Sequence, residues 1–216
     1  MARPKRQPGE PDVRQRIGDA CWELLATRRI SQITVGDVAE RAHCNRGTFY
    51  YHYEDMNALV DAMIEHELTA ECSLPAVMFY LTAGSGLPAD RQEMAARTGR
   101  VRLVMERGGM NLVFAKSLEV ALGMWSAVLC PDGSPLEEET RIAIEYAVGG
   151  TLGLLSLGHE LDAGADGFEE RDAVFSTLTD CAEHLLAKIS GSQGISEEAL
   201  RARLAIVVSL AKNARA

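Results

Sequence analysis

Residues 34–59 read T-V-G-D-V-A-E-R-A-H-C-N-R-G-T-F-Y-Y-H-Y-E-D-M-N-A-L, and this stretch decides the fold. Thr34 comes directly before a short run whose apolar residues recur at helical spacing, and its hydroxyl can accept a hydrogen bond from an amide of the first turn. Asp37 follows three residues later, where the positive end of a helix favours a carboxylate. We therefore predict a short helix over 35–42 with small apolar side chains facing inward.

A second short helix follows after a tight turn at residues 43–44. Asn45 is a favoured N-cap residue, which predicts a helix over about 46–52. Phe49 and Tyr53 are four residues apart, so both can pack on the preceding helix while their polar neighbours face outward. Two short helices joined by a tight turn form a helix-turn-helix.

The segments on either side of this motif are also helical by pattern. Before it, apolar residues recur at helical spacing from Val13 and predict a first helix that ends near Arg28 or Arg29. After it, Asp55 is a suitable cap for a fourth helix. Residues 1–11 contain three prolines, one glycine and three basic residues, and we expect them to form a flexible basic arm.

Beyond residue 70 the pattern is helical, and no run alternates for long enough to predict a strand. Glycine and proline clusters separate the apolar segments. The sequence therefore predicts an all-α protein with a three-helix helix-turn-helix head over 12–53 and a larger helical body over 54–216. The helices predicted in the body beyond the fourth cover 73–82, 89–107, 110–129, 135–160, 168–190 and 196–213.

The composition is that of an ordinary globular chain, with 47% hydrophobic and 25% charged residues among 216. Five scattered cysteines form no C-x-x-C pair, so we expect reduced thiols packed as small core side chains, with no disulfide framework and no metal site. The longest apolar stretch, Tyr146–Gly158, has thirteen residues and is too short to cross a bilayer. No cleavable leader follows the basic N-terminus, and we expect a cytoplasmic protein without a membrane partner.

The charge is distributed unevenly along the chain. A net charge of −9 argues against nucleic acid as a partner, because duplex DNA is itself a line of negative charge. Residues 1–53, however, carry nine basic and six acidic residues, a net charge of +3, whereas the rest of the chain carries −12. A locally basic head on an acidic body is typical of a protein whose one end approaches phosphates.

Residues 34–59 resemble the signature of TetR-family repressors, and the similarity extends back to about Val13. The segment combines a capped helix, a turn, a G-T-aromatic-Tyr element and a restarted helix at fixed spacing. Two positions depart from the family pattern. His43 stands in the turn where the family has glycine, and it must accept a left-handed backbone. Met56 stands at the start of the fourth helix where the family has a lysine that touches phosphate, which puts one backbone contact in doubt.

The resemblance implies that the helix over 46–52 enters the major groove of duplex DNA with its early residues nearest the bases. Arg46 can pair with guanine, Asn45 can bond a base or a phosphate, and Thr48 can touch a thymine methyl. We expect phosphate contacts from Tyr50 and His52, and from the free backbone amides at the helix start that follows Thr34. The predicted DNA-binding residues are Thr34, Asn45, Arg46, Gly47, Thr48, Tyr50 and His52. The basic residues Arg3, Lys5 and Arg6 can reach the minor groove or a phosphate, or can simply be solvated.

The resemblance also implies functions for the body. Family bodies commonly enclose a small-molecule pocket, for which adaptable or aromatic side chains are candidates, although each can equally be plain core. The helices over 135–160 and 168–190 resemble the pair through which the family dimerises, and glycines would allow a second helix to approach closely. The ligand candidates are Met78, Phe79, Met94, Met105, Phe114, Met124 and Trp125, and the dimer candidates are Gly149, Gly150 and Gly153.

Together these inferences predict a TetR-type DNA-binding transcription regulator, a repressor by family habit, that reads a palindromic operator as a homodimer. Its half-sites would lie about 34–36 Å apart or a multiple of that. A small-molecule effector in the body would release the DNA by favouring one of two conformations. One alternative is a regulator whose body senses a protein partner or nothing. The other is a helical enzyme, for which the histidines offer no recognisable catalytic spacing, and we predict no catalytic residues and no cofactor.

Overall fold

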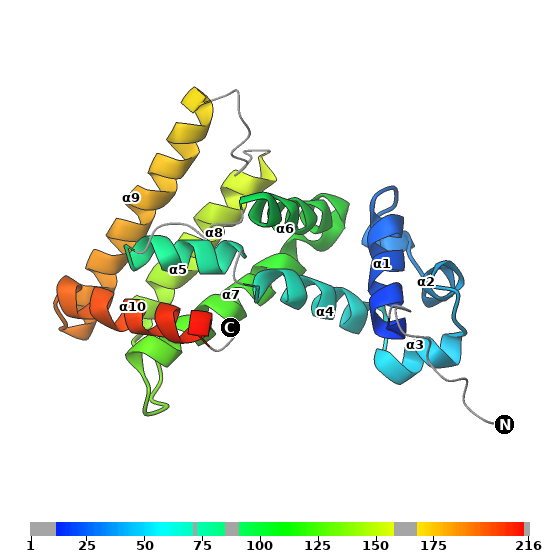
Figure 1. Ribbon diagram of the computed structural model, residues 1–216, viewed down its shortest axis with the longest axis horizontal. Helices are drawn as coiled ribbons and strands as arrows, with labels where there is room; N and C mark the ends of the chain where they lie inside the picture. The colour runs from blue at the N-terminus through cyan, green and yellow to red at the C-terminus, as the bar shows by residue number, and fades with distance from the viewer. Residues whose placement is uncertain (1–11, 71–72, 85–90, 158–167, 214–216) are drawn as a thin grey trace.

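The computed structural model describes residues 12–70, 73–84, 91–157 and 168–213, and the described residues form helices and connecting turns without a strand. Figure 1 shows a small head made of α1 to α3 at one end, with α4 leading from it into a larger body. The all-α fold predicted from the sequence is confirmed. The predicted arm over 1–11 lies outside the described residues.

The head contains α1 (Val13–Leu25), the 3-10 turn η1 (Ile30–Gln32), α2 (Val35–Arg41) and α3 (Arg46–His52). The predicted end of the first helix near residue 28 or 29 is wrong, because the chain leaves the helix after Leu25. The amide of Arg29, which would continue the helix, donates to Oε1 of Gln32 at 3.2 Å. The carbonyl of Leu25 accepts instead from the side chain of Arg107, far along the sequence.

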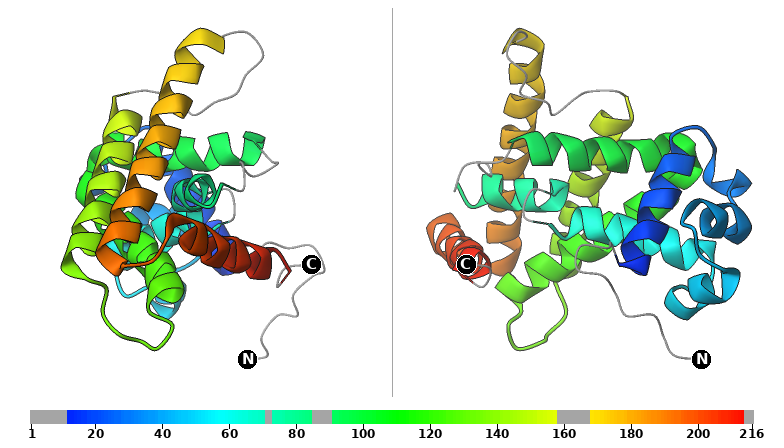
Figure 2. Two further views of the ribbon diagram at one scale, coloured as in Figure 1. Left: turned by 90° about the vertical axis from the view of Figure 1, so that its left-hand side faces the viewer. Right: turned by 45° about the vertical axis from the view of Figure 1, so that its right-hand side comes forward.

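The body is built from longer helices around two large buried clusters and a smaller third one. In Figures 1 and 2, α9 rises along the side of the body away from the head, with α8 beside it, and α10 crosses the base of the body. The predicted helix boundaries hold to within about four residues; α9 continues through Gly191 and stops before Gly194, whose φ is +63°. The elements are α4 (Met56–Leu68), α5 (Leu74–Thr82), α6 (Arg91–Val104), the π turn η2 (Met105–Gly109), α7 (Met110–Leu129), α8 (Glu138–Ser156), α9 (Phe168–Gln193) and α10 (Glu197–Asn213).

The core of the head continues into the body. Phe49 of α3, Leu59 of α4 and Val104 of α6 belong to one cluster of fully buried side chains, which also takes in Leu152 of α8. A second cluster, centred on Trp125 of α7, joins α5, α7, α8, α9 and α10. Buried apolar surface of this kind is the main source of folding stability, so head and body stabilise each other.

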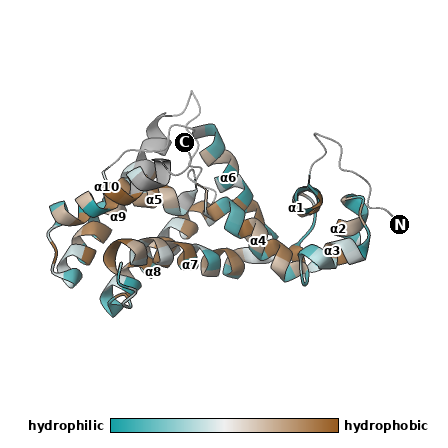
Figure 3. Ribbon diagram, turned by 60° about the horizontal axis from the view of Figure 1, so that its bottom comes forward, coloured by the Kyte–Doolittle hydropathy of each residue, from teal (hydrophilic) through white to brown (hydrophobic). Residues whose placement is uncertain are grey.

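The helix α7 contributes to both of the large clusters. It also lies within Gln92–Leu129, which among the described residues is the one helical run that is apolar enough and long enough to cross a membrane. Core helices of folded proteins pass the same test, and hydropathy colouring shows α7 as largely hydrophobic where it lies under the body (Figure 3). The run is broken at Gly108, whose φ is +97°. The longest apolar helical run is not 146–158, as the sequence predicted. The most apolar window of Gln92–Leu129 is 28% buried, and α7 contributes Val113 to one buried cluster and Trp125 to another.

The break between α6 and α7 is where the body touches the head. A Cβ atom added to Gly109 would lie 2.8 Å from Cδ1 of Ile30 in η1 and 2.6 Å from Cγ1 of Val104, so only glycine fits there. Arg107, within the same turn, donates from Nε to the carbonyl of Leu25 at 2.9 Å and from Nη2 to the carbonyl of Ala26 at 2.7 Å. The last carbonyls of a helix have no hydrogen-bond partner within the helix, and these two are among them. A cation such as the Arg107 guanidinium is also favoured by the negative end of the helix dipole.

A buried carboxylate joins α4 to α6 close to this junction. Glu67 is only 1% exposed, and its two oxygens accept from Arg97 at 3.1 Å and Arg100 at 2.9 Å. Arg97 also contacts Glu93 on its own helix, at 2.7 Å. The ring of His66 lies 3.4 Å from Glu67. A carboxylate removed from water in this way requires such partners, so the orientation of α4 relative to α6 depends on the cluster.

We expect Glu67→Ala to lower the free energy of unfolding by about 3 kcal/mol, the lower end of the range for breaking a buried ion pair, because Arg97 and Arg100 can still reach water. The matched control is Glu65→Ala, which removes the same side chain from an exposed position on the same helix and should change stability by less than about 0.5 kcal/mol. Urea unfolding of both variants measures the difference. Equal stabilities of the two variants would contradict the assignment.

Candidate nucleic-acid interface and body cavity

The burial of Phe49 sets which face of α3 points outward. Phe49 is completely buried and, like Tyr53, belongs to one core with Val38 of α2, as the sequence predicted. With about 3.6 residues per turn, Gly47 and Tyr51 then lie on the opposite face of the helix. Tyr51 is 78% exposed, the most of any aromatic side chain on this helix. The sequence analysis missed Tyr51, although counting around the helix from Phe49 would have found it.

Asn45 begins α3 and holds its first turn in shape. Its Oδ1 accepts from the amide of Thr48 at 2.7 Å and from the hydroxyl of Thr48 at 3.1 Å, so the predicted N-cap is confirmed. A Cβ on Gly47 would lie 3.2 Å from the same Oδ1, which glycine avoids. The side-chain nitrogen Nδ2 of Asn45 is not used in this cap and can still donate, and the residue is exposed. A donor of this kind suits a phosphate oxygen or a base acceptor.

Arg46 lies across the neighbouring helix. Its side chain is exposed, and Nη2 is 2.7 Å from the point where a Cβ on Gly36 would be placed. The absence of a side chain on Gly36 therefore lets the guanidinium rest against the start of α2. Because the contact is with the flexible end of an exposed side chain, Arg46 can swing outward to meet a base or phosphate.

Thr34 is the N-cap of α2, as predicted, and it forms a reciprocal capping box with Asp37. Thr34 donates to the Asp37 carboxylate from its amide at 2.8 Å and from its hydroxyl at 2.6 Å, and the amide of Asp37 donates back to the Thr34 hydroxyl at 3.2 Å. These bonds from Thr34, together with Arg28 at 3.3 Å, hold the pKa of Asp37 below its ordinary value. A phosphate contact by Thr34, as predicted, would have to share donors with this carboxylate.

The remaining predicted residues lie near the end of α3. Tyr50 is exposed, and its ring meets Phe49 edge-on at a centroid distance of 5.7 Å. His52 is half-buried and lies edge-on to Tyr51 at 5.0 Å. The exposed face of the head therefore brings together Asn45, Arg46, Gly47, Tyr50 and Tyr51, with Thr48 and His52 at its margins.

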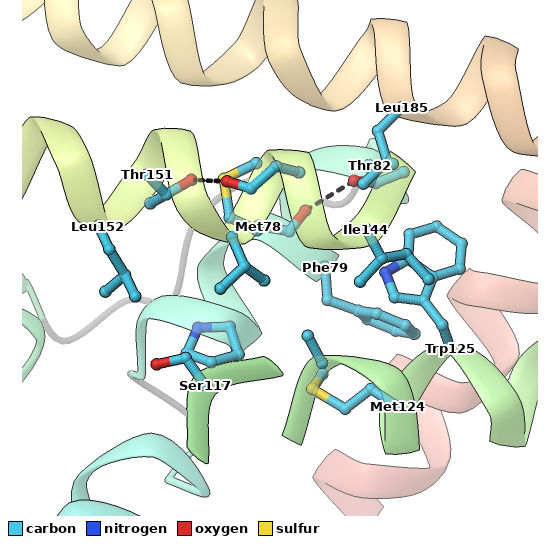
Figure 4. Close-up of a pocket in the computed structure, with 14 residues that line it drawn as sticks. Met78, Phe79, Thr82, Ser117, Met124, Trp125, Ile144, Thr151, Leu152 and Leu185 are labelled. Atoms are coloured by element: carbon cyan, nitrogen blue, oxygen red, sulfur yellow. Dashed lines mark hydrogen bonds between the residues drawn. The ribbon is translucent and has the colours of Figure 1, made fainter. Parts of the chain in front are cut away.

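A cavity of about 40 Å³ lies in the body between α5, α7, α8 and α9 (Figure 4). Four of the predicted ligand residues line it, namely Met78, Phe79, Met124 and Trp125. The other predicted residues are placed elsewhere: Met105 packs in the core shared with the head, Met94 packs with Val77 and Leu178, and Phe114 is partly exposed beside Gly149. The sequence analysis missed the three hydroxyl residues of the cavity, Thr82, Ser117 and Thr151.

An open groove runs along the outer faces of α8 and α9, with a volume of about 770 Å³. Tyr146 lines it and is 78% exposed, and Gly150 lines it without any atom within 4 Å of an added Cβ. Of the other two predicted glycines, Gly153 also has free space, whereas a Cβ on Gly149 would contact Phe114 of the same chain at 3.6 Å. Gly149 therefore faces α7, away from the groove.

The model of the bacterial regulatory proteins of the tetR family matches residues 17–63, which run from the first to the fourth helix. By its head, the chain is a TetR family transcriptional regulator. The matched segment is a helix-turn-helix DNA-binding domain, and its α3 is the helix with the outward face described above.

Structural comparison matches the chain to two solved TetR proteins. The TetR family repressor AlkX from Dietzia sp. strain DQ12-45-1b, implicated in biodegradation of n-alkanes, is 15% identical, with a TM-score of 0.43 over 85% of this chain and 100% of that one. A TetR transcriptional regulator from Rhodococcus sp. RHA1 is 16% identical, with a TM-score of 0.46 over 81% and 95% of the two chains. A comparison with curated proteins found no match.

The two departures from the TetR pattern have clear structural outcomes. His43 has φ of +51°, as predicted for a side chain in the place of glycine. Its amide donates to the carbonyl of Glu40 and the amide of Cys44 donates to the carbonyl of Ala39, a Schellman ending of α2. Met56, where the family has lysine, is half-buried against the core of the head.

We expect His43→Gly to raise the free energy of unfolding by roughly 0.5–1 kcal/mol, because glycine occupies the left-handed region without the crowding of a Cβ. The control is His43→Ala, which keeps a Cβ and should show no gain. Urea unfolding of the three proteins under one buffer condition decides the matter. An alanine variant as stable as the glycine variant would assign the gain to loss of the imidazole and not to the backbone.

Proposed function

We propose that this TetR family regulator binds a palindromic operator as a homodimer, and that a small molecule in the body releases the DNA, so that the protein acts as a cytoplasmic repressor. The observation that carries the proposal is the outward face of α3, where the N-cap Asn45, an exposed arginine and two exposed tyrosines surround Gly47. A glycine at the centre of that face lets the helix approach a groove closely. The net charge of +3 over residues 1–53 favours the same approach.

We expect Arg46→Ala to weaken binding to a specific duplex, selected from a random pool, by about 1–3 kcal/mol and to relax the preferred base at one position of each half-site, because a bidentate arginine–guanine contact is lost. The control is Arg141→Ala, which removes the same charge from an exposed site in the body. Fluorescence anisotropy at several salt concentrations measures both effects. Uniform weakening with an unchanged base preference would assign Arg46 to a phosphate.

The second copy needed for a palindrome is proposed to dock on the groove of α8 and α9. Large apolar side chains stand in water there, including Ile142 and Tyr146, and a water-exposed apolar patch beside a groove is typical of an interaction site. A two-fold pairing of this face would place Tyr146 of each copy against the groove of the other. Gly150 would allow helices to approach closely, whereas Gly149 is proposed no longer as a contact, because it faces Phe114.

We expect Tyr146→Asp to weaken dimerisation roughly 30-fold or more, a loss of about 2 kcal/mol, because a buried aromatic anchor at an interface would be replaced by a charge. Ile206→Asp is the matched control, since Ile206 is also a large exposed apolar side chain but lies on α10 outside the groove. Sedimentation equilibrium gives the dissociation constants. A wild-type protein that is monomeric at micromolar concentration, or an equal effect of the two variants, would contradict the proposed interface.

Release of DNA by a ligand is supported by the way α7 connects the cavity to the head. Ser117 and Ala121 of α7 line the cavity, and α7 begins directly after the turn whose Arg107 holds the end of α1. Val148 of α8 lines the cavity and packs against both cores. A change in the cavity would therefore reach the contacts of α1 through continuous helices. A protein partner in place of a small molecule remains the second candidate, with the same readout in the head.

A further inference from the structure

We propose that the body cavity takes an uncharged, mainly apolar organic molecule that offers a hydrogen-bond acceptor to Ser117. The inference rests on the proposed function for the existence of an effector, and it adds the chemical class of that effector. Three observations carry it: a buried hydroxyl without a partner, neighbouring hydroxyls whose protons are already committed, and walls without charge.

Ser117 is the first observation. It lies in the middle of α7, is 2% exposed and lines the cavity, and its Oγ has no hydrogen-bond partner among the described residues. A serine inside a helix commonly donates to the carbonyl four residues back, but this one does not. Leaving a buried hydroxyl unsatisfied destabilises the fold, so a partner entering the cavity would recover that loss on binding.

The two threonines of the cavity behave differently. Thr82 donates to the carbonyl of Met78 at 2.8 Å, and Thr151 donates to the carbonyl of Ala147 at 2.7 Å. Figure 4 shows both bonds as dashed lines, whereas none reaches Ser117. Because a hydroxyl has one proton, the threonines can only accept from a ligand. Ser117 is thus the hydroxyl lining the cavity that is free to donate, and a carbonyl or ether oxygen is the group it would bind.

The walls exclude ions. The residues that line the cavity include no acidic, basic or histidine side chain. A carboxylate or an ammonium group would lose its hydration there without gaining an opposite charge, which is far less favourable than for a neutral group. Phe79 and Trp125 form one wall as an edge-on pair with centroids 5.8 Å apart, a surface suited to an aromatic ring.

The size of the cavity requires an adaptable wall. At about 40 Å³ it is small for an organic molecule, since ligand pockets typically measure roughly 300–1,000 Å³. Met78 and Met124 line it and are half-buried, and unbranched thioether side chains adjust easily to a new neighbour. A ligand therefore binds as these side chains withdraw, which makes the occupied body a different conformation from the empty one.

The experiment uses the full chain with Trp22→Phe, which leaves Trp125 as the remaining tryptophan, so that its indole N–H resonance reports binding at the cavity. The probes share a ring with a two-carbon substituent: acetophenone, ethylbenzene, phenylacetate and protonated 1-phenylethylamine. We expect acetophenone to bind about tenfold more tightly than ethylbenzene, as for one net hydrogen bond, and the two ions to shift the resonance only at concentrations at least about a hundredfold higher.

Ser117→Ala should bring the affinities of acetophenone and ethylbenzene together while leaving the melting temperature of the empty protein unchanged or higher. Thr151→Val is the control, because its hydroxyl proton is committed to the helix, and it should keep the tenfold preference. Ionic probes that bind as well as acetophenone would overturn the proposal. So would a preference that survives Ser117→Ala, or the absence of any shift up to the solubility limit.

Duplex binding measured on the same samples separates this inference from the proposed function. Specific DNA binding without the Ser117-dependent preference overturns the ligand class and leaves the regulator intact. The Ser117-dependent preference in a protein that binds no duplex overturns the proposed regulator and leaves the ligand class intact. If acetophenone binds but the affinity for duplex DNA does not change, only the proposed release of DNA by this class of molecule is overturned.

Discussion

The burial of Phe49 is the constraint on which the function of the head depends. Because that ring has no exposure, α3 cannot rotate, and Gly47 and Tyr51 must face outward. The caps at Thr34 and Asn45 then fix where each short helix begins, which neither could do alone, since helices of seven residues are unstable in isolation. The shape of the proposed DNA-binding face is therefore set by apolar packing, and its polar residues would supply the chemistry at the surface.

The head in turn depends on the body. Arg107 supplies from η2 the hydrogen bonds that α1 lacks at its end, and Gly109 admits Ile30 at a distance that no other residue would allow. Lys116 of α7 pairs with Asp61 of α4 at 3.2 Å, and Glu67 ties α4 to α6. The contacts lie on one continuous core, so a displacement of α6 or α7 changes the support of α1 and α4 together.

Local features explain why so much was predictable from the sequence. The caps at Thr34, Asn45 and Asp55 act within three residues, and the strain at His43 follows from a turn that needs a left-handed residue. What escaped prediction depends on partners distant in sequence: the early end of α1 needs Arg107, and the hydroxyl of Ser117 is distinguished from other serines only by what surrounds it. Helical periodicity reports burial but not which buried side chains surround a void, so Met105 and Met124 looked alike.

The small cavity bears directly on how a switch of this kind could operate. A ligand shifts an equilibrium only by its difference in affinity for the two states. A preformed, roomy pocket would bind nearly as well in both, whereas a cavity of about 40 Å³ offers little room for an organic ligand in the conformation seen here. Binding and expansion must then occur together, between α5, α7 and α8. Since α7 leads directly to the turn that holds α1, the small cavity would supply, under the proposed mechanism, the differential affinity that ligand-gated regulation requires.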